Sequence, residues 1–194
     1  MDTTFYFDIS KTGSCYSFAR KLKQLMEKEL DDICDYDREI IYLCIGSDRS
    51  TGDSLGPLVG HRLSNLYTFN HTVYGTLKNP VHAVNLSQYI EDIYCTHRNP
   101  FIIAIDASLG SKNHVGYVTL STEPLKPGLG VKKQLREVGD ISVTGIVNFS
   151  GILDTMVLQS TRLSTVMELS EFISHGIVSA AHMSAAHADN RQLI

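Results

Sequence analysis

Two continuous apolar runs, at residues 40–45 and 101–105, constrain the fold of this chain more than any other feature. A strand with one solvated face alternates between apolar and polar residues, whereas a strand buried on both faces reads as an unbroken apolar run. Both runs therefore predict inner strands of a sheet that is covered on both sides. Segments with helical spacing of apolar residues lie between and after them, which is typical of α/β layering around a mainly parallel sheet.

The rest of the chain adds further elements to this arrangement. Helical spacing predicts helices at residues 13–30, 55–66, 86–97 and 153–173. A short strand is predicted at residues 72–77, and the apolar content of residues 141–147 predicts a further inner strand. Residues 114–121 alternate between apolar and polar side chains, which predicts an outer or antiparallel strand. The tail, residues 175–194, is rich in Ala, Ser and His, and we expect it to be loosely ordered or to extend the last helix.

Composition excludes several classes of protein. The 194 residues, 43% of them hydrophobic and 20% charged, predict one globular domain with its core at residues 39–174. A net charge of −4 without a basic stripe argues against nucleic-acid binding. The four cysteines are scattered without a C-x-x-C pair, which predicts a reduced, cytoplasmic protein rather than a disulfide framework. The N-terminus is too polar for a signal peptide, and no apolar run reaches the length of a membrane span.

An aspartate follows each apolar run: Asp53 after the first and Asp106 after the second. Parallel strands would bring both to the carboxyl edge of the sheet, where ligands bind in open α/β folds. Two carboxylates held close together do not both ionise easily, so one can act as general base and the other as general acid. With a third ligand, the pair could instead hold a divalent metal. The structural alternative is that each aspartate caps a helix or a turn.

Three further residues are expected near the same edge. His82 follows the turn at residues 78–80 and would supply a proton or the third metal ligand. Asn79 and Asn148 would orient a substrate amide. For all three, hydrogen bonding within a turn or a strand end is the alternative. Asp48 shares the loop of Asp53, and we interpret it as a turn residue.

Gly46 and Gly52 flank the loop that carries Asp53 and would let backbone N–H groups approach a peptide carbonyl or an anion. Their spacing matches neither G-x-G-x-x-G nor a P-loop, so a nucleotide-binding Rossmann-like module has weak support. No G-x-S-x-G motif is present, and no cysteine falls in an expected edge loop. The sequence therefore does not predict a serine or cysteine hydrolase.

Two motifs carry a family resemblance: Gly46-x5-Gly-Asp53-x-Leu-Gly-Pro57 and Ile-Ala-Ile-Asp106-Ala. Together they resemble the germination protease of spore-forming bacteria and, more distantly, the hydrogenase-maturation endopeptidases. The resemblance runs from about residue 39 to about residue 154. Over nearly the whole chain, the sequence is also similar to the YyaC family of sporulation proteins, smaller relatives of that protease.

This resemblance implies a three-layer α/β/α sandwich of the phosphorylase/hydrolase type, as in the hydrogenase-maturation proteases. It also implies that Asp53 and Asp106 are the catalytic pair of a cytoplasmic peptidase that acts in sporulation on a protein or peptide substrate. In the maturation endopeptidases, the same two positions hold nickel ligands together with a later histidine. Residues 142–147, where that histidine would fall, contain none. No cofactor is therefore expected, with a divalent metal as the alternative.

Three alternatives stay open at this point. The first is a metal-dependent hydrolase that uses Asp53, Asp106 and His82. The second is a non-catalytic sporulation scaffold or regulator that retains the fold, and the third is the nucleotide-binding module. Whether the protein forms oligomers is also open.

Overall fold

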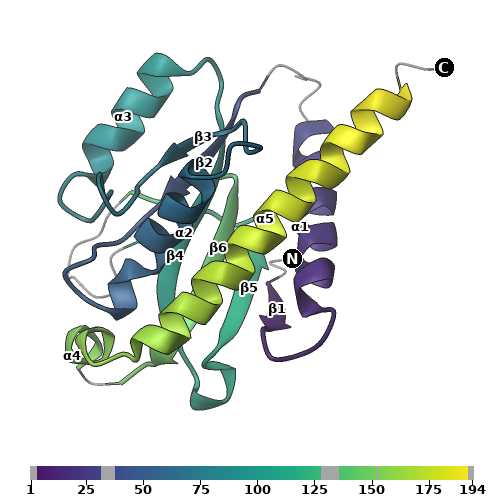
Figure 1. Cartoon of the computed structure of the whole chain (residues 1–194). Coiled ribbons are helices and arrows are strands. Elements are labelled where there is room, and N and C mark those ends of the chain that lie inside the picture. Colours follow the sequence, from purple (N-terminus) through teal and green to yellow (C-terminus); the bar gives the residue numbers. More distant parts are fainter. Residues whose placement is uncertain (1–3, 32–37, 128–135, 152, 192–194) are drawn as a thin grey trace.

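A six-stranded sheet forms the centre of the molecule in the computed structural model, which describes residues 4–31, 38–127, 136–151 and 153–191 (Figure 1). The strand order is β1-β5-β6-β4-β2-β3. The strands are β1 (Phe5–Asp8), β2 (Ile40–Cys44), β3 (Thr72–Tyr74), β4 (Phe101–Gly110), β5 (Tyr117–Ser121) and β6 (Ile141–Phe149). β6, β4, β2 and β3 pair in parallel, and β5 is antiparallel to both β6 and β1. The predicted mainly parallel sheet is confirmed.

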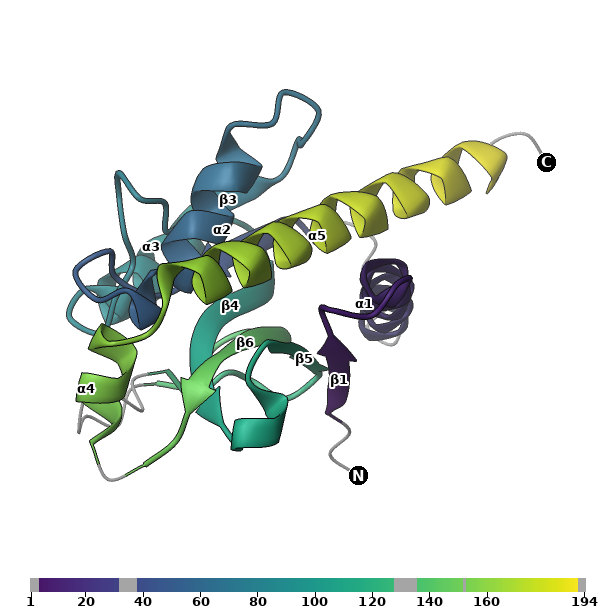
Figure 2. The same ribbon diagram turned by 60° about the horizontal axis from the view of Figure 1, so that its bottom comes forward.

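Helices cover both faces of the sheet, which confirms the α/β/α layering. One face packs against α1 (Ser14–Asp31), α2 (Leu55–Ser64) and α5 (Leu163–Arg191). The other face packs against α3 (Leu86–Thr96) over β2 and β4. Figure 2 shows α5 crossing the sheet, with the short α4 (Asp154–Gln159) beside its N-terminal end. No helix in the described part of the chain is long and apolar enough to span a membrane.

β2 and β4 are buried on both faces, as their continuous apolar runs predicted. In β2, the side chains of Tyr42 and Cys44 face α1, α2 and α5, whereas Ile41 and Leu43 face α3. All four are fully buried. The alternation of side-chain direction along a strand thus places apolar groups in both cores.

β5 and β6 differ, because only one of their faces is apolar. Val118 on β5 and Val143 on β6 enter the core under α5. The residues that follow them, Thr119 and Thr144, point to the opposite face. β6 was predicted as an inner strand, and it is one, between β4 and β5. Its second face is nevertheless polar.

The structure corrects four details of the expected secondary structure. β1, at residues 5–8, was not predicted, and it makes β5 an internal strand instead of an outer one. The third predicted strand, at residues 72–77, ends at Tyr74. β4 continues to Gly110, so Asp106 lies within this strand and not after it. The predicted helix at residues 153–173 is two helices, α4 and α5.

The break between α4 and α5 has a side-chain cause. Thr161 Oγ1 donates a hydrogen bond to the Val157 carbonyl oxygen at 2.8 Å, and Asn148 Nδ2 donates to Thr161 Oγ1 at 3.2 Å. Side-chain bonds of this kind compete with the helical pattern of the backbone. They end α4 and tie it to the C-terminal end of β6.

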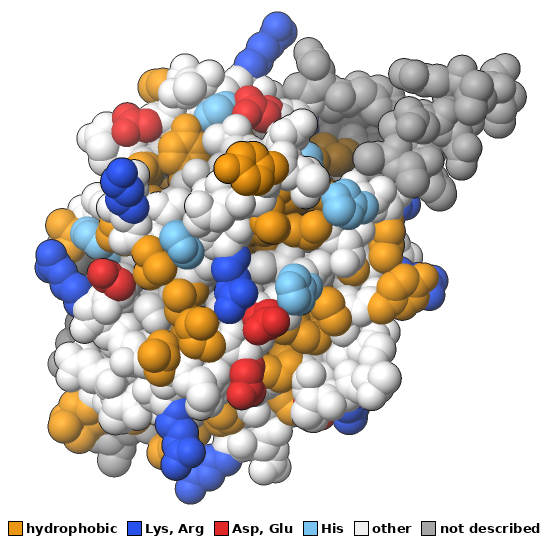
Figure 3. Space-filling model, in the orientation of Figure 1, with side chains coloured by type: hydrophobic (Ala, Val, Ile, Leu, Met, Phe, Trp, Pro, Cys, Tyr) orange, Lys and Arg blue, Asp and Glu red, His pale blue; other side chains and the backbone are white. Residues whose placement is uncertain are grey.

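The tail is an extension of the last helix. α5 runs to Arg191, and Ile177 and Ala180 are fully buried in the core shared with α1. Loose order from residue 175 was therefore the wrong alternative, because these apolar side chains continue the packed face of the helix. The charged side chains of the α5 face of the molecule are interspersed in sign (Figure 3).

Candidate active site

The loop after β2 folds back on itself and brings Asp53 to the carboxyl end of the parallel strands. Gly46 has φ +139°, and a Cβ there would lie 2.0 Å from the backbone oxygen of Asp53. Only glycine fits this combination of backbone angle and close approach. The Ser47 N–H donates to the same Asp53 oxygen at 3.0 Å. Gly46 is therefore needed for the position of Asp53.

Gly56 and Pro57 then place α2 directly against the end of β2. A Cβ on Gly56 would lie 2.0 Å from the carbonyl oxygen of Ile45, so no larger residue fits without a shift of the helix. Pro57 sits in the first turn of α2, as predicted, where its missing N–H has no intrahelical partner to lose. The Leu-Gly-Pro part of the motif thus has a packing role that fixes the 3₁₀ turn η1 (Gly52–Ser54), on which Asp53 lies.

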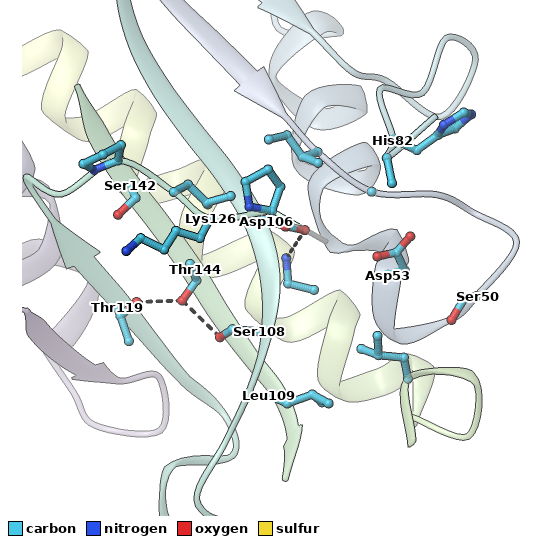
Figure 4. Close-up of a pocket in the computed structure, with 18 of the residues that line it drawn as sticks. Ser50, Asp53, His82, Asp106, Ser108, Leu109, Thr119, Lys126, Ser142 and Thr144 are labelled. Carbon is cyan, nitrogen blue, oxygen red and sulfur yellow. Dashed lines mark hydrogen bonds between the residues drawn. The ribbon is translucent and has the colours of Figure 1, made fainter. Parts of the chain in front are cut away.

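Asp106 reaches the same place from β4. The parallel register pairs Cys44 of β2 with Ile105 of β4, so Asp106 is the first β4 residue beyond the end of β2. Its side chain is only 9% exposed, and its Oδ1 accepts a hydrogen bond from the Ala107 N–H at 2.7 Å. Figure 4 shows Asp53 and Asp106 on neighbouring elements of one cavity. The two predicted aspartates are therefore brought together.

This cavity has a volume of about 380 Å³ and lies over β4, β6 and β5. Its walls come from the segment 124–127 and from α4 with the end of β4, and they combine apolar side chains such as Leu125 and Leu158 with polar ones. Its floor carries the two carboxylates and several hydroxyl groups. The residues that line it are Thr4, Ile45, Gly46, Ser50, Asp53, His82, Ala83, Asp106, Ala107, Ser108, Leu109, Thr119, Ser121, Glu123, Pro124, Leu125, Lys126, Pro127, Ser142, Thr144, Thr155, Leu158 and Gln159.

The environment raises the pKa of both carboxyl groups. For Asp53 the main cause is burial, opposed by the hydrogen bond from the Ser47 N–H and by the nearby His82, which lower the pKa. For Asp106 burial raises the pKa well above 3.8, and the charge of Asp53 raises it further. The deeper carboxyl, Asp106, thus holds its proton more strongly, as expected when one of two neighbouring carboxylates must stay neutral.

The capping alternative does not describe Asp53. Ser54, and not Asp53, occupies the N-cap position of α2, and no side chain makes the capping hydrogen bond there. Asp106 bonds the N–H of its own neighbour within β4 and caps no helix. The burial of both carboxylates in a cavity therefore has no explanation in local hydrogen bonding.

Of the other residues predicted near this edge, only His82 lines the cavity. Its Nδ1 accepts a hydrogen bond from the Val84 N–H at 3.3 Å, and its ring turns away from the two carboxylates in Figure 4. Asn79 lies outside the cavity in an exposed turn, where its N–H donates to Thr76 Oγ1. Asn148 is also outside, because its side chain is engaged in holding the end of α4.

Two loop features behave differently from expectation. Gly46 does not offer its N–H to a ligand, since this group donates to the Val81 carbonyl oxygen at 2.7 Å. Gly52 instead allows close packing, because a Cβ there would lie 2.8 Å from the Leu158 carbonyl oxygen of α4. Asp48 is exposed and outside the cavity, in agreement with a turn role.

No metal site is evident in the described ranges, which omit residues 1–3, 32–37, 128–135, 152 and 192–194. Within them, no group of three or more His, Cys, Asp or Glu side chains is arranged to hold a metal ion. Asp53, Asp106 and His82 would be the ligands that a metal could recruit here, after rotation of the His82 ring.

Sequence reasoning missed the hydroxyl groups of the cavity. Thr119 and Ser121 on β5, and Ser142 and Thr144 on β6, all line it. The signal was present as alternation: hydroxyl residues occupy every second position between buried valines, leucines and isoleucines. In a strand this pattern gives one apolar and one polar face.

Ser50 was also missed. Its Oγ is buried beside Asp53 and has no hydrogen-bond partner among the described residues (Figure 4). A buried hydroxyl without a partner is uncommon, because it costs about 1–3 kcal/mol.

Comparisons with known proteins extend the sequence resemblance. Residues 13–176 match the family model described as "Protein of unknown function (DUF1256)". The chain is 51% identical over 140 residues to the uncharacterized protein YyaC of Bacillus subtilis (strain 168), which covers 72% of this chain and 68% of that protein. The similarity to YyaC that the motifs predicted is thereby confirmed. A solved structure, the [NiFe] hydrogenase maturation protease HycI from Thermococcus kodakarensis KOD1, matches with a TM-score of 0.44 and 16% identity, over 76% of this chain and 97% of that one.

Proposed function

The chain belongs to the DUF1256 family, and we propose that it is a peptidase whose catalytic groups are Asp53 and Asp106. One observation carries the proposal: a buried carboxyl group, Asp106, and a partly buried one, Asp53, line one cavity, both have a raised pKa, and the charge of Asp53 raises the pKa of Asp106. Burying two carboxyl groups without a cation or a full set of donors is unfavourable for folding. Such a cost is typical of functional sites.

The difference between the two carboxyl groups assigns their roles. Asp53, whose pKa burial raises but the Ser47 N–H and His82 partly lower again, is the general base and takes a proton from water. The water oxygen then attacks the peptide carbonyl carbon, while protonated Asp106 donates its proton to the carbonyl oxygen. In the second half, Asp53 gives its proton to the amide nitrogen as the C–N bond breaks. Asp106 recovers its proton from the hydroxyl group of the intermediate as the product carboxyl forms.

Ser50 supplies a further polar group for this reaction. Its hydroxyl has no partner in the described structure and lies beside Asp53. It is the donor at hand to hold the attacking water or the substrate carbonyl. A donor that is fixed before the reaction stabilises developing charge without reorganisation.

The resemblance of the two aspartate motifs to the germination protease supports a role in sporulation. On this proposal, the substrate is a protein made by a spore-forming cell. The cavity volume of about 380 Å³ lies in the range of small-ligand sites and suits a short peptide segment, not a folded domain.

The test is a comparison of newly formed peptide ends. A protein extract of sporulating cells is incubated with the purified full chain, with Asp53→Asn and with Asp106→Asn, and new N-termini are identified by mass spectrometry. We expect new termini with the unaltered chain and none with Asp53→Asn or Asp106→Asn. Asp48→Asn is the matched control, because this exposed aspartate lies outside the cavity, and it should cut like the unaltered chain.

Two outcomes would redirect the proposal. If termini form equally with all variants, the aspartates are not catalytic; if none form even with the unaltered chain, a scaffold that retains the fold is the better description. If cutting stops on addition of a chelator and returns with a divalent metal, the metal-dependent alternative replaces the metal-free pair.

A further inference from the structure

The cavity floor beyond Asp106 carries a row of hydroxyl groups that the proposed reaction does not use. The sheet register places Asp106 of β4 beside Thr144 of β6, and Thr144 beside Thr119 of β5. The next row holds Ser142 beside Ser121. All five residues line the same cavity. The floor is therefore a polar strip that begins at a catalytic group and crosses two further strands.

These hydroxyl groups form a short chain of hydrogen bonds with unused capacity. Ser108 Oγ donates to Thr144 Oγ1 at 3.0 Å, and the Oγ1 atoms of Thr144 and Thr119 are 2.7 Å apart (Figure 4). If Thr144 passes its proton on to Thr119, the Thr119 proton is left to face the cavity. Ser142 donates to no acceptor within the described ranges. At least two hydroxyl donors are thus available to a ligand.

The spacing of the strip matches an extended peptide. Neighbouring strands lie about 4.8 Å apart, so within this row Thr144 and Thr119 lie about 5 and 10 Å from Asp106. An extended chain advances about 3.3 Å per residue, and alternate side chains point the same way. When the scissile bond lies over Asp106 and the peptide runs along the row, the side chain two residues away lies about 6.6 Å from Asp106. This position is over Thr144, between Asp106 and Thr119.

We propose that Ser108, Thr144, Thr119 and Ser142 form a specificity subsite for a neutral polar side chain, that is Ser, Thr, Asn or Gln, two residues from the scissile bond. The inference rests on the proposed function and names its substrate class. An apolar side chain would leave the hydroxyl groups unpaired after excluding water, which is a strong source of discrimination.

Acidic side chains are disfavoured at this subsite for a different reason. Lys126 of the cavity wall is exposed and is paired with Glu137 at 3.3 Å. A carboxylate over Thr144 would lie near Asp106 without a counter-ion. Burying an uncompensated charge costs more than burying a neutral polar group.

The test uses a peptide library in which each position is randomised in turn. The full chain is incubated with the library, and the residues flanking the cuts are read by mass spectrometry. In a second arm, the same library is passed over the immobilised Asp53→Asn protein, so that retention is measured without turnover. We expect Ser, Thr, Asn and Gln to be enriched about five- to tenfold over apolar and acidic residues at one position, two residues from the cut.

The double variant Thr119→Val/Thr144→Val should lose this enrichment, since Val keeps the shape and removes the hydroxyl group. Thr72→Val is the matched control, because Thr72 is a strand residue that bonds Glu39 outside the cavity. Ser142→Ala provides the same test with a smaller change if the double variant does not fold. Retention of the full preference in the double variant and in Ser142→Ala would overturn the subsite.

The two arms separate this inference from the proposed function. Cutting without the polar preference overturns the subsite and leaves the peptidase standing. A polar preference in retention without cutting supports the subsite and contradicts the peptidase. If the library is neither cut nor retained, both are wrong.

Discussion

The two faces of the sheet differ, although the same strands build both. On the face under α1, α2 and α5, β4 presents Phe101, Ile103 and Ile105 to the main hydrophobic core. On the other face, β4 presents Ile102 and Ala104 to the α3 side and then Asp106 to the cavity. The change from core to site on this second face takes place within two residues.

This difference shows how one sheet separates stability from chemistry. Alternating side chains let β5 and β6 contribute Val118 and Val143 to the closed core, while Thr119 and Thr144 face the cavity. The face under α1, α2 and α5, called the closed face below, buries apolar surface, and each Å² stabilises the fold by about 25 cal/mol. The face that carries the cavity, called the open face below, can therefore hold two carboxyl groups in an unfavourable environment.

The largest expected effect is on the rate of peptide hydrolysis, and it comes from the two aspartates of the open face. Asp53→Asn and Asp106→Asn should each lower the rate of peptide hydrolysis by about 10²- to 10⁴-fold, because each removes a general acid or base. Peptide cleavage assays on both variants check this. Since the two groups act as a unit, the double variant should be little worse than either single one. A double variant in which the two losses multiply would indicate independent roles.

On the closed face, the expected effect is on stability and not on chemistry. Ile103→Ala should lower the free energy of unfolding by about 2–5 kcal/mol, because it removes a fully buried side chain from a core with no room to adjust. Urea denaturation measures this. Activity per folded molecule should be retained, and a loss of activity in fully folded protein would show that the two faces are not separate.

The pH dependence of stability distinguishes the faces further. The folded pKa of Asp106 is raised above its unfolded value, so the folded state binds the extra proton. The stability that this group contributes is present below about pH 4, and it is lost as the pH rises through the folded pKa. Asp106→Asn should reduce this slope and raise the free energy of unfolding at neutral pH, because the amide carries no charge to bury. Urea denaturation as a function of pH checks both; equal slopes would mean that Asp106 is not destabilised in the folded state.

The smallest effect is expected at the hydroxyl groups. Ser142→Ala should change the free energy of unfolding by less than about 1 kcal/mol, because Ser142 donates no hydrogen bond to a described residue and faces the cavity. Thermal denaturation beside Ile103→Ala gives the comparison. A cost as large as that of Ile103→Ala would mean that the open face also supports the fold.

Much of the fold could be predicted because it depends on local patterns. The apolar runs of β2 and β4 indicated strands buried on both faces, and helical spacing located α1, α2 and α3 within a few residues. β1 was missed because four residues, none of them fully buried, give too short a pattern. The break at Thr161 was missed because it depends on Asn148, a partner 13 residues away in the sequence.

The candidate site was predicted only in part. Asp53 and Asp106 could be paired from sequence, since both follow strands expected to be parallel neighbours. Asn79 and Asn148 were also placed near this edge, yet strand ends alone do not say which way a side chain points. Ser50 gave no sequence signal, because an unpaired hydroxyl is a property of its surroundings.

The sequence by itself determined most of the strands and helices and which two carboxyl groups share the strand edge. It did so because spacing and apolar runs act over a few residues. Only the tertiary structure decided that the carboxyl groups are buried beside one another and that hydroxyl groups of β4, β5 and β6 continue the floor beyond them. Burial, pKa and the rows across a sheet depend on neighbours that are distant in the chain. The strand register, which no local pattern fixes, sets those neighbours.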